Sequence, residues 1–132
     1  MEFLHPKNWS KTPGFSNGVA ASGRTVFVAG QVGWNPLTSE FETDDFAEQV
    51  RQCLANTVAV LAEAGAEPSH IARMTWYVTD KQEYLSALRG VGAAYRDVIG
   101  RHFPAMALGQ VVALVEDRAK VEIETTAVVP TA

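Results

Sequence analysis

The chain has 132 residues, of which 47% are hydrophobic and 20% are charged. This length suits one domain, and this composition excludes intrinsic disorder, collagen-like repeats and charge-dominated tails. The net charge of −4 gives no broad positive field for phosphate backbones, so we expect no nucleic-acid partner and a single domain over residues 1–132.

Short β-branched and aromatic runs dominate the first third of the chain. Val19–Ala21 and Thr25–Ala29 flank the pair Ser22-Gly23, and this pattern predicts a β-hairpin. Glycines and a proline then predict a loop over residues 30–43, with a short strand around Glu40 to Glu42.

The next segment has helical spacing. Asp45 and Glu48 are spaced like a capping box, and apolar residues then recur with a helical period until Gly65. Strict alternation over residues 74–79 predicts a strand. In the helix predicted after Asp45, Cys53 lies beside apolar Leu54. We therefore interpret Cys53 as a buried packing thiol and not as a nucleophile.

A second helix is predicted between Asp80 and Gly100, because Asp80 and Glu83 repeat the capping-box spacing. Gly90 and Gly92 weaken this helix by roughly 1 kcal/mol each relative to alanine. We therefore expect close packing at these glycines.

Two strands complete the chain, over residues 105–115 and 121–129, with a charged turn between them. The fold class is α+β, a mixed sheet with both helices on one face. The first of these strands is apolar on both faces at Leu108, Val111, Val112 and Leu114. Two helices cover only one face of a sheet, so we predict that a homo-oligomer buries the other.

The single cysteine leaves no internal disulfide, and a cytoplasmic location is the simplest prediction. Apolar runs stay below the ~18 residues of a membrane span, and Met1 to Asn8 lack a signal-peptide pattern. His5, His70 and His102 are scattered without metal-ligand spacing, so we expect no metal, no cofactor and no membrane partner.

Glu122 and Glu124 alternate with apolar residues and point to the same face of the last strand. If association buries that face, desolvation raises a carboxyl pKa and makes it a proton carrier. If the strand is a solvated edge, the two glutamates are surface residues, and spacing alone favours this alternative.

The sequence resembles the RidA family, also called the YjgF family, of enamine and imine deaminases. The matching segments occur in the family's order across nearly the whole chain: Arg24 to Gly33, Leu61 to Ala66, Val78-Thr79-Asp80, Phe103-Pro104-Ala105 and Val121 to Glu124. The resemblance implies a chorismate-mutase-like subunit in a homotrimer, with small-molecule clefts between neighbouring chains.

The resemblance also assigns residues. Glu122 matches the glutamate that holds the attacking water, whereas Met106 stands where the family has an arginine that grips the substrate carboxylate. Phe15, after one inserted residue, matches a cleft tyrosine. Further substrate contacts are expected at Gly30, Gln31, Gly33, Trp34 and Leu108. The Trp34 ring either covers the cleft or packs under its own loop.

The sequence therefore predicts a hydrolase of enamines or imines with a more apolar pocket. Its substrate is less anionic or carries its carboxylate elsewhere, in reach of Arg24, Arg73 or Arg101. The alternative is a non-catalytic trimer that binds a small molecule or stabilises a partner. RNA cleavage, which has been attached to some relatives, gains little support because there is no histidine pair for acid and base roles.

Overall fold

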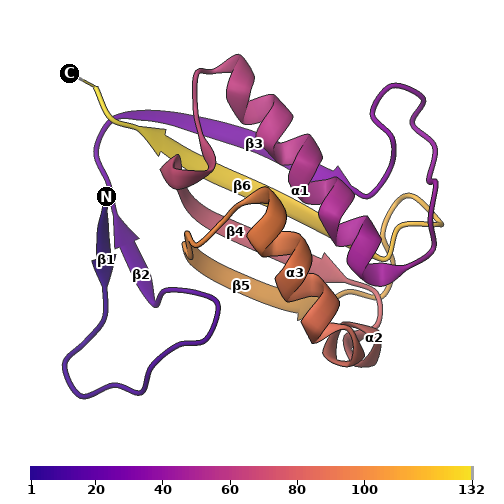
Figure 1. The fold of residues 1–132 in the computed structure, drawn as a ribbon, viewed down its shortest axis with the longest axis horizontal. Coiled ribbons are helices and arrows are strands. Elements are labelled where there is room, and N and C mark those ends of the chain that lie inside the picture. Colours follow the sequence, from indigo (N-terminus) through magenta and orange to yellow (C-terminus); the bar gives the residue numbers. More distant parts are fainter. Residues whose placement is uncertain (132) are drawn as a thin grey trace.

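The computed structural model describes residues 1–131, and its centre is a four-stranded sheet (Figure 1). The strand order is β3 (Arg24–Val32), β6 (Val121–Val129), β4 (Ile71–Val78) and β5 (Ala105–Gln110). β6 is antiparallel to β3 and β4, while β5 is parallel to β4. The result is the mixed sheet that the sequence predicts.

Two crossovers place the helices on one face of this sheet (Figure 1). Helix α1 (Phe46–Glu63) leads from β3 to β4 through a 3₁₀ turn, η1 (Pro68–His70). Helices α2 (Lys81–Ser86) and α3 (Leu88–Val98) lead from β4 to β5. Parallel strands need such crossovers, because a tight hairpin reverses the chain. The α+β class with helices on one face is confirmed.

Side-chain caps begin two of the helices where the sequence predicts them. The Asp45 carboxylate accepts a hydrogen bond from the backbone N–H of Glu48 at 3.0 Å. Asp80 accepts from the N–H groups of Gln82 and Glu83 at 2.9 and 3.3 Å. These bonds satisfy donors that have no partner inside the helix.

The prediction of one continuous helix after Asp80 was wrong, because the chain breaks at Ala87. The Ala87 N–H bonds to the carbonyl of Tyr84, three residues back, and the helix restarts at Leu88. The break lets α3 approach α1 closely. A Cβ added to Gly90 would lie 2.9 Å from the Ala47 Cβ, so close packing requires this glycine, as the sequence suggests.

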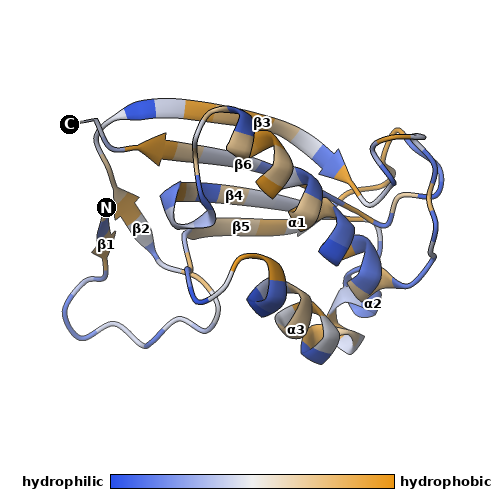
Figure 2. Ribbon diagram, turned by 45° about the horizontal axis from the view of Figure 1, so that its top comes forward, coloured by the Kyte–Doolittle hydropathy of each residue, from blue (hydrophilic) through white to orange (hydrophobic). Residues whose placement is uncertain are grey.

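The core lies between the helices and the sheet. Its fully buried side chains include Leu54 and Leu61 of α1 and Met74 of β4. Cys53 is among them, and burial raises the pKa of its thiol, which confirms a packing role. Figure 2 shows a hydrophobic band in the middle of β3 between hydrophilic ends.

The predicted hairpin between Val19–Ala21 and Thr25–Ala29 was wrong. β2 (Gly18–Ala20) pairs instead with β1 (Glu2–Leu4), and β3 pairs with β6. Gly23 explains the difference, since its φ of +147° carries the chain tightly past the end of β6. Any Cβ there would collide with the Val129 carbonyl oxygen. The glycine thus directs the chain into the main sheet.

The strand predicted over residues 105–115 is too long. β5 ends at Gln110, and Val111 makes one further bond, to the Val78 carbonyl at 2.9 Å. Residues 111–120 then form a loop. The predicted strand was too long because apolar alternation alone does not distinguish an exposed loop from a strand. The strand expected around Glu40 to Glu42 is only an isolated bridge between Asn35 and Glu40.

The apolar face inferred from Leu108, Val111, Val112 and Leu114 was also wrong. Leu108 packs against the core, and the other three lie in the loop after β5. The open face of the sheet, opposite the helices, is mostly polar. Large exposed hydrophobic side chains include Phe27 on β3, which is 79% exposed, and Leu37, Val112 and Val115 outside the strands. The homo-oligomer stays a prediction.

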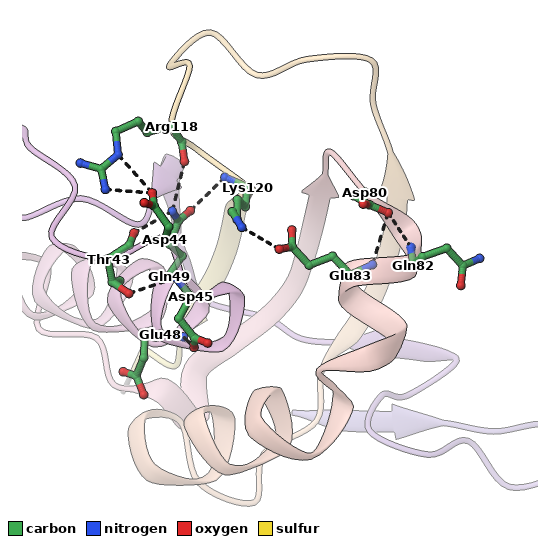
Figure 3. Close-up of polar contacts among 10 residues, drawn as sticks. All are labelled: Thr43, Asp44, Asp45, Glu48, Gln49, Asp80, Gln82, Glu83, Arg118 and Lys120. Carbon is green, nitrogen blue, oxygen red and sulfur yellow. Dashed lines mark hydrogen bonds and ion pairs between the residues drawn. The ribbon is translucent and has the colours of Figure 1, made fainter.

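A buried glutamine fixes two loops at one end of the sheet (Figure 3). Gln49 is fully buried, and its amide nitrogen donates to the carbonyls of Thr43 and Arg118, both at 3.1 Å. Its amide oxygen accepts from the Lys120 N–H at 2.9 Å. α1 thereby holds the loop before it and the loop before β6.

The N-terminal segment is attached beside β5. The Ser16 N–H donates to the Pro104 carbonyl at 3.0 Å, and its hydroxyl donates to the Phe103 carbonyl at 2.6 Å. These bonds place Phe15 near the start of β5. Across residues 1–131, no helix is both long and apolar enough to pass through a bilayer.

Candidate functional site

The first candidate site is a cavity of about 430 Å³ on the helix side of the sheet, which we call the helix-side pocket. It lies between the N-terminal segment, α2, α3 and the two strands β4 and β5. Its lining residues are Pro13, Gly14, Phe15, Trp76, Tyr84, Leu88, Val91, Gly92, Tyr95, Arg96, Phe103 and Met106. Its volume falls in the range of small-molecule sites.

Strand register decides which predicted residues enter this pocket. Met106 pairs with buried Met74 in the parallel ladder, so its side chain points toward the helices. Phe15 also lines this pocket. Leu108 has the same orientation but packs against the core and does not line the cavity.

Five of the twelve lining residues of the pocket are aromatic. Tyr95 and Phe103 stack with centroids 5.7 Å apart, and the Tyr95 hydroxyl donates to the His102 carbonyl at 2.6 Å. Trp76 is 2% exposed. Its indole N–H is buried without an acceptor among residues 1–131, which costs stability in the isolated chain.

Two polar groups in this pocket escaped the sequence analysis. Arg96 is the one charged side chain among the lining residues, and Tyr84 carries a hydroxyl whose pKa is raised by burial. A usable signal existed for Arg96, because Leu88, Gly92 and Arg96 are each four residues apart on α3. That spacing places these three residues on one side of the helix. Tyr84 lies on α2, before the break at Ala87.

The second candidate site lies on the open face, and we call it the open-face hollow. It has a volume of about 280 Å³ and is lined by Gly30, Gln31, Val32, Trp34, Val115, Glu116 and Glu122. Glu122 and Glu124 both point to this face, as their spacing predicts, because their neighbours Val121 and Ile123 are fully buried on the other.

The carboxylate of Glu122 packs directly on Gly30. A Cβ added to Gly30 would lie 2.7 Å from the Glu122 Oε2 atom, so only glycine leaves the carboxylate its position. Gly30 lies in a bulge, where the register between β3 and β6 shifts between Val28 and Gln31. Glu122 is half-buried, and the structure brings its carboxylate against the glycine loop.

Trp34 packs within its own loop, and whether it covers a cleft between copies of the chain stays a prediction. Its ring packs on Phe41 of its own loop, with centroids 5.9 Å apart, and it also borders the open-face hollow. Gly33 does not line the hollow. A Cβ there would lie 2.8 Å from backbone atoms of Gln49, so this glycine lets the loop approach α1.

Tyr77, His70 and His102 have local partners. The Tyr77 hydroxyl donates to Glu124 at 2.7 Å, and this bond is the main cause that raises the pKa of Tyr77. His70 accepts from the Glu67 N–H, while His102 bonds to the Ile71 carbonyl. Within residues 1–131, no group of three His, Cys, Asp or Glu side chains is arranged to hold a metal ion.

The predicted residues therefore fall into two groups on opposite faces of the sheet. Phe15 and Met106 lie in the helix-side pocket, whereas Gly30, Trp34 and Glu122 lie in the open-face hollow. The two cavities share no lining residue. A site that combines both groups must take them from different copies of the chain.

Comparison with known proteins gives this division a family context. The family model described as Endoribonuclease L-PSP matches residues 8–129. The chain belongs to the RidA/YjgF family. The structure of YyfB, a Rid-family protein of unknown function from Yersinia pestis, matches with a TM-score of 0.83 at 32% identity, covering 97% of this chain and 98% of that one.

Two other proteins that this chain matches bear on small-molecule chemistry. The human protein named 2-iminobutanoate/2-iminopropanoate deaminase is 29% identical over 80% of this chain and 73% of its own length. E. coli TdcF, solved with bound serine, matches with a TM-score of 0.70 at 27% identity, covering 98% of this chain and all of that one.

Proposed function

We propose that this RidA-family protein hydrolyses reactive enamines or imines to a carbonyl compound and ammonia. The observation that carries the proposal is the carboxylate of Glu122, held half-buried against Gly30 in a hollow that also exposes the glycine-loop backbone. The name of the human relative, a deaminase of imino acids, supports the same reaction class.

The proposed reaction needs only water and one proton carrier. Glu122 accepts a proton from water while the water oxygen bonds to the imine carbon, and the C=N electron pair moves to nitrogen. The nitrogen anion formed in this way takes the proton from Glu122 and becomes the neutral carbinolamine. The hydroxyl proton then passes through Glu122 to the same nitrogen as the C–N bond breaks, so that ammonia leaves and the carbonyl product remains. An enamine first becomes the imine by taking a proton on carbon and losing one from nitrogen.

We place the complete site between copies of the chain in a homotrimer. One copy supplies the helix-side pocket for the substrate body, and its neighbour supplies Glu122. Support comes from the division of the two cavities and from Phe27 and Val115, which are 79% and 97% exposed in the single chain. Exposed side chains of this size commonly mark contact surfaces. We place the reaction in the cytoplasm, where the lone thiol stays reduced.

A direct assay tests the reaction. The purified protein is given 2-aminoacrylate, generated in place, and separately a neutral cyclic imine, and the carbonyl product is measured. Glu122→Gln should lower turnover by ~10²- to 10⁴-fold, the usual contribution of a general acid–base group. Activity on neither substrate by a folded protein would refute the proposal.

A second candidate is a non-catalytic trimer that binds a small molecule, and Met106 favours it. Methionine cannot make the charged contacts of an arginine, which contribute ~1.5 to 3 kcal/mol each. Under this alternative, Glu122→Gln changes no turnover and leaves ligand affinity intact. We do not propose RNA cleavage, because the three histidines are engaged in local contacts.

A further inference from the structure

We propose that Arg96 is the carboxylate anchor of the helix-side pocket, and that the ligand is a 2-oxo or 2-imino acid with a large apolar side chain. This inference rests on the proposed function for the identity of the reacting group. It assigns a role to a residue that lies on α3, across the pocket from Met106. The sheet presents a thioether at Met106, and the helix presents a guanidinium at Arg96.

The position of Arg96 supports this role. A Cβ added to Gly92 would lie 3.5 Å from the Arg96 Nη1 atom, so the guanidinium folds back over Gly92, which itself lines the pocket. Among residues 1–131, Arg96 has no ion-pair or hydrogen-bond partner. Arg51, Arg118 and Lys120, by contrast, each pair with a carboxylate. The guanidinium is exposed at the pocket mouth and free to bind an anion.

The three arginines suggested by the sequence are in poorer positions than Arg96 to bind a carboxylate in the helix-side pocket. Arg24 donates to the Ala64 carbonyl at 2.5 Å, Arg73 lies on the open face, and Arg101 is exposed outside the helix-side pocket. The other residues that line the pocket are neutral and mostly apolar. None of them is acidic, so no lining carboxylate can pair with Arg96. Charge complementarity therefore selects an anion at this mouth.

The rest of the pocket defines the body of the ligand. Leu88 begins α3 and Arg96 lies eight residues later, roughly 12 Å along the helical rise, while Tyr84 lies before the break at Ala87, on α2. Leu88 and Val91 line the wall between Arg96 and Tyr84. A ligand anchored at Arg96 thus extends an apolar side chain along this wall toward Tyr84, over the ring of Trp76.

Equilibrium binding of stable 2-oxo acids tests the anchor without any turnover. The probes are phenylpyruvate, phenylacetone, which replaces the carboxylate by a methyl group, and pyruvate, which lacks the apolar body. Calorimetry on the assembled protein gives each Kd. Because Arg96 is solvent-exposed, Arg96→Gln should weaken phenylpyruvate binding roughly three- to tenfold and leave phenylacetone binding unchanged. Arg96→Lys should restore part of the loss.

Arg89→Gln is the matched control, because Arg89 is an exposed arginine of the same helix outside the pocket. It should change none of the affinities. Added salt should weaken phenylpyruvate binding to the wild type and have little effect on Arg96→Gln. Pyruvate should bind more weakly than phenylpyruvate to every variant.

Three results would overturn the anchor: no phenylpyruvate binding by the wild type at millimolar concentration, equal losses for both phenyl probes in Arg96→Gln, or no loss at all. The proposed reaction fails separately, when Glu122→Gln retains turnover. Binding that depends on Arg96, without hydrolysis, would support the role of Arg96 as the anchor and refute the proposed enzymatic activity.

Discussion

The helix-side pocket and the open-face hollow lie on opposite faces of one sheet, and each has what the other lacks. The pocket is large and apolar, and its one charge is the cation Arg96. The hollow is smaller and contains the acids Glu116 and Glu122 beside a glycine loop. The pocket suits binding of a substrate body, and the hollow suits activation of water. Neither cavity alone has the parts of a complete hydrolase site.

The largest expected effect comes from mixing two inactive variants. Glu122→Gln leaves the helix-side pocket intact, and Gly92→Trp fills that pocket while it leaves Glu122 intact. If each site takes its two halves from neighbouring copies, unfolding and refolding the two chains together at equal amounts should restore turnover to about a quarter of the wild-type value. Each variant alone should have at most ~1% of that value.

The quarter follows because a site needs the pocket of one variant and the hollow of the other, each present with a probability of about one half. Mixing either variant with itself is the control and should restore nothing. No recovery in a mixture that forms mixed oligomers would show that the two cavities do not act together.

The next effect concerns the Gln49 amide, which should stabilise the hollow and not the pocket. Gln49→Leu removes three hydrogen bonds and leaves the Lys120 N–H and two carbonyls without partners in the interior. We expect a loss of roughly 2 to 4 kcal/mol in the free energy of unfolding, measured by urea denaturation.

Gln52→Leu is the control on the same helix, because Gln52 makes one side-chain bond, to Asn56 at 2.8 Å. It should cost about 1 kcal/mol or less. In the folded Gln49→Leu protein, phenylpyruvate affinity should be unchanged while turnover falls. Equal stability losses for the two variants would contradict the special role of Gln49.

Local patterns predicted the elements well, whereas long-range pairing was out of their reach. The span Val121–Val129 and the caps at Asp45 and Asp80 follow from alternation and capping chemistry, which depend on near neighbours. The pairing of β3 with β6 was missed because Gly23 is equally compatible with a hairpin turn and with a chain that passes close to the end of β6. Only the tertiary structure separates these two alternatives.

The sequence named candidate site residues but could not give their arrangement. The resemblance picked Met106 and Glu122, and spacing placed Glu122 and Glu124 on one face. Which face each residue takes depends on ladder register, since a shift of one residue reverses every side chain. Arg96 was missed because its role depends on Gly92 and on the cavity beneath it, which a chain-order analysis does not describe.

A smaller effect should follow from crowding the hollow. Gly30→Ala places a Cβ 2.7 Å from the Glu122 carboxylate, which is flexible and can move aside. The fold should survive, and turnover should fall roughly ten- to a hundredfold because the carboxylate is displaced from its working position. Gly109→Ala is the control, since a Cβ there meets no atom within 4 Å. Steady-state kinetics compare the two variants. Unchanged turnover in Gly30→Ala would show that the reaction does not depend on the position of the Glu122 carboxylate.

The smallest effect should come from the pocket side, where two glycines of α3 should respond with opposite signs. Gly90→Ala gains roughly 1 kcal/mol of helix propensity but forces a Cβ to 2.9 Å from Ala47, and overpacking costs ~1 to 3 kcal/mol, so the protein should lose about 1 kcal/mol of stability. Gly92→Ala meets its nearest atom at 3.5 Å, an ordinary contact, and should gain up to about 1 kcal/mol. Thermal unfolding of both variants measures the difference. If Gly90→Ala also stabilises the protein, α3 can move away from α1 to accommodate the added methyl group, and the wall of the helix-side pocket is not rigid.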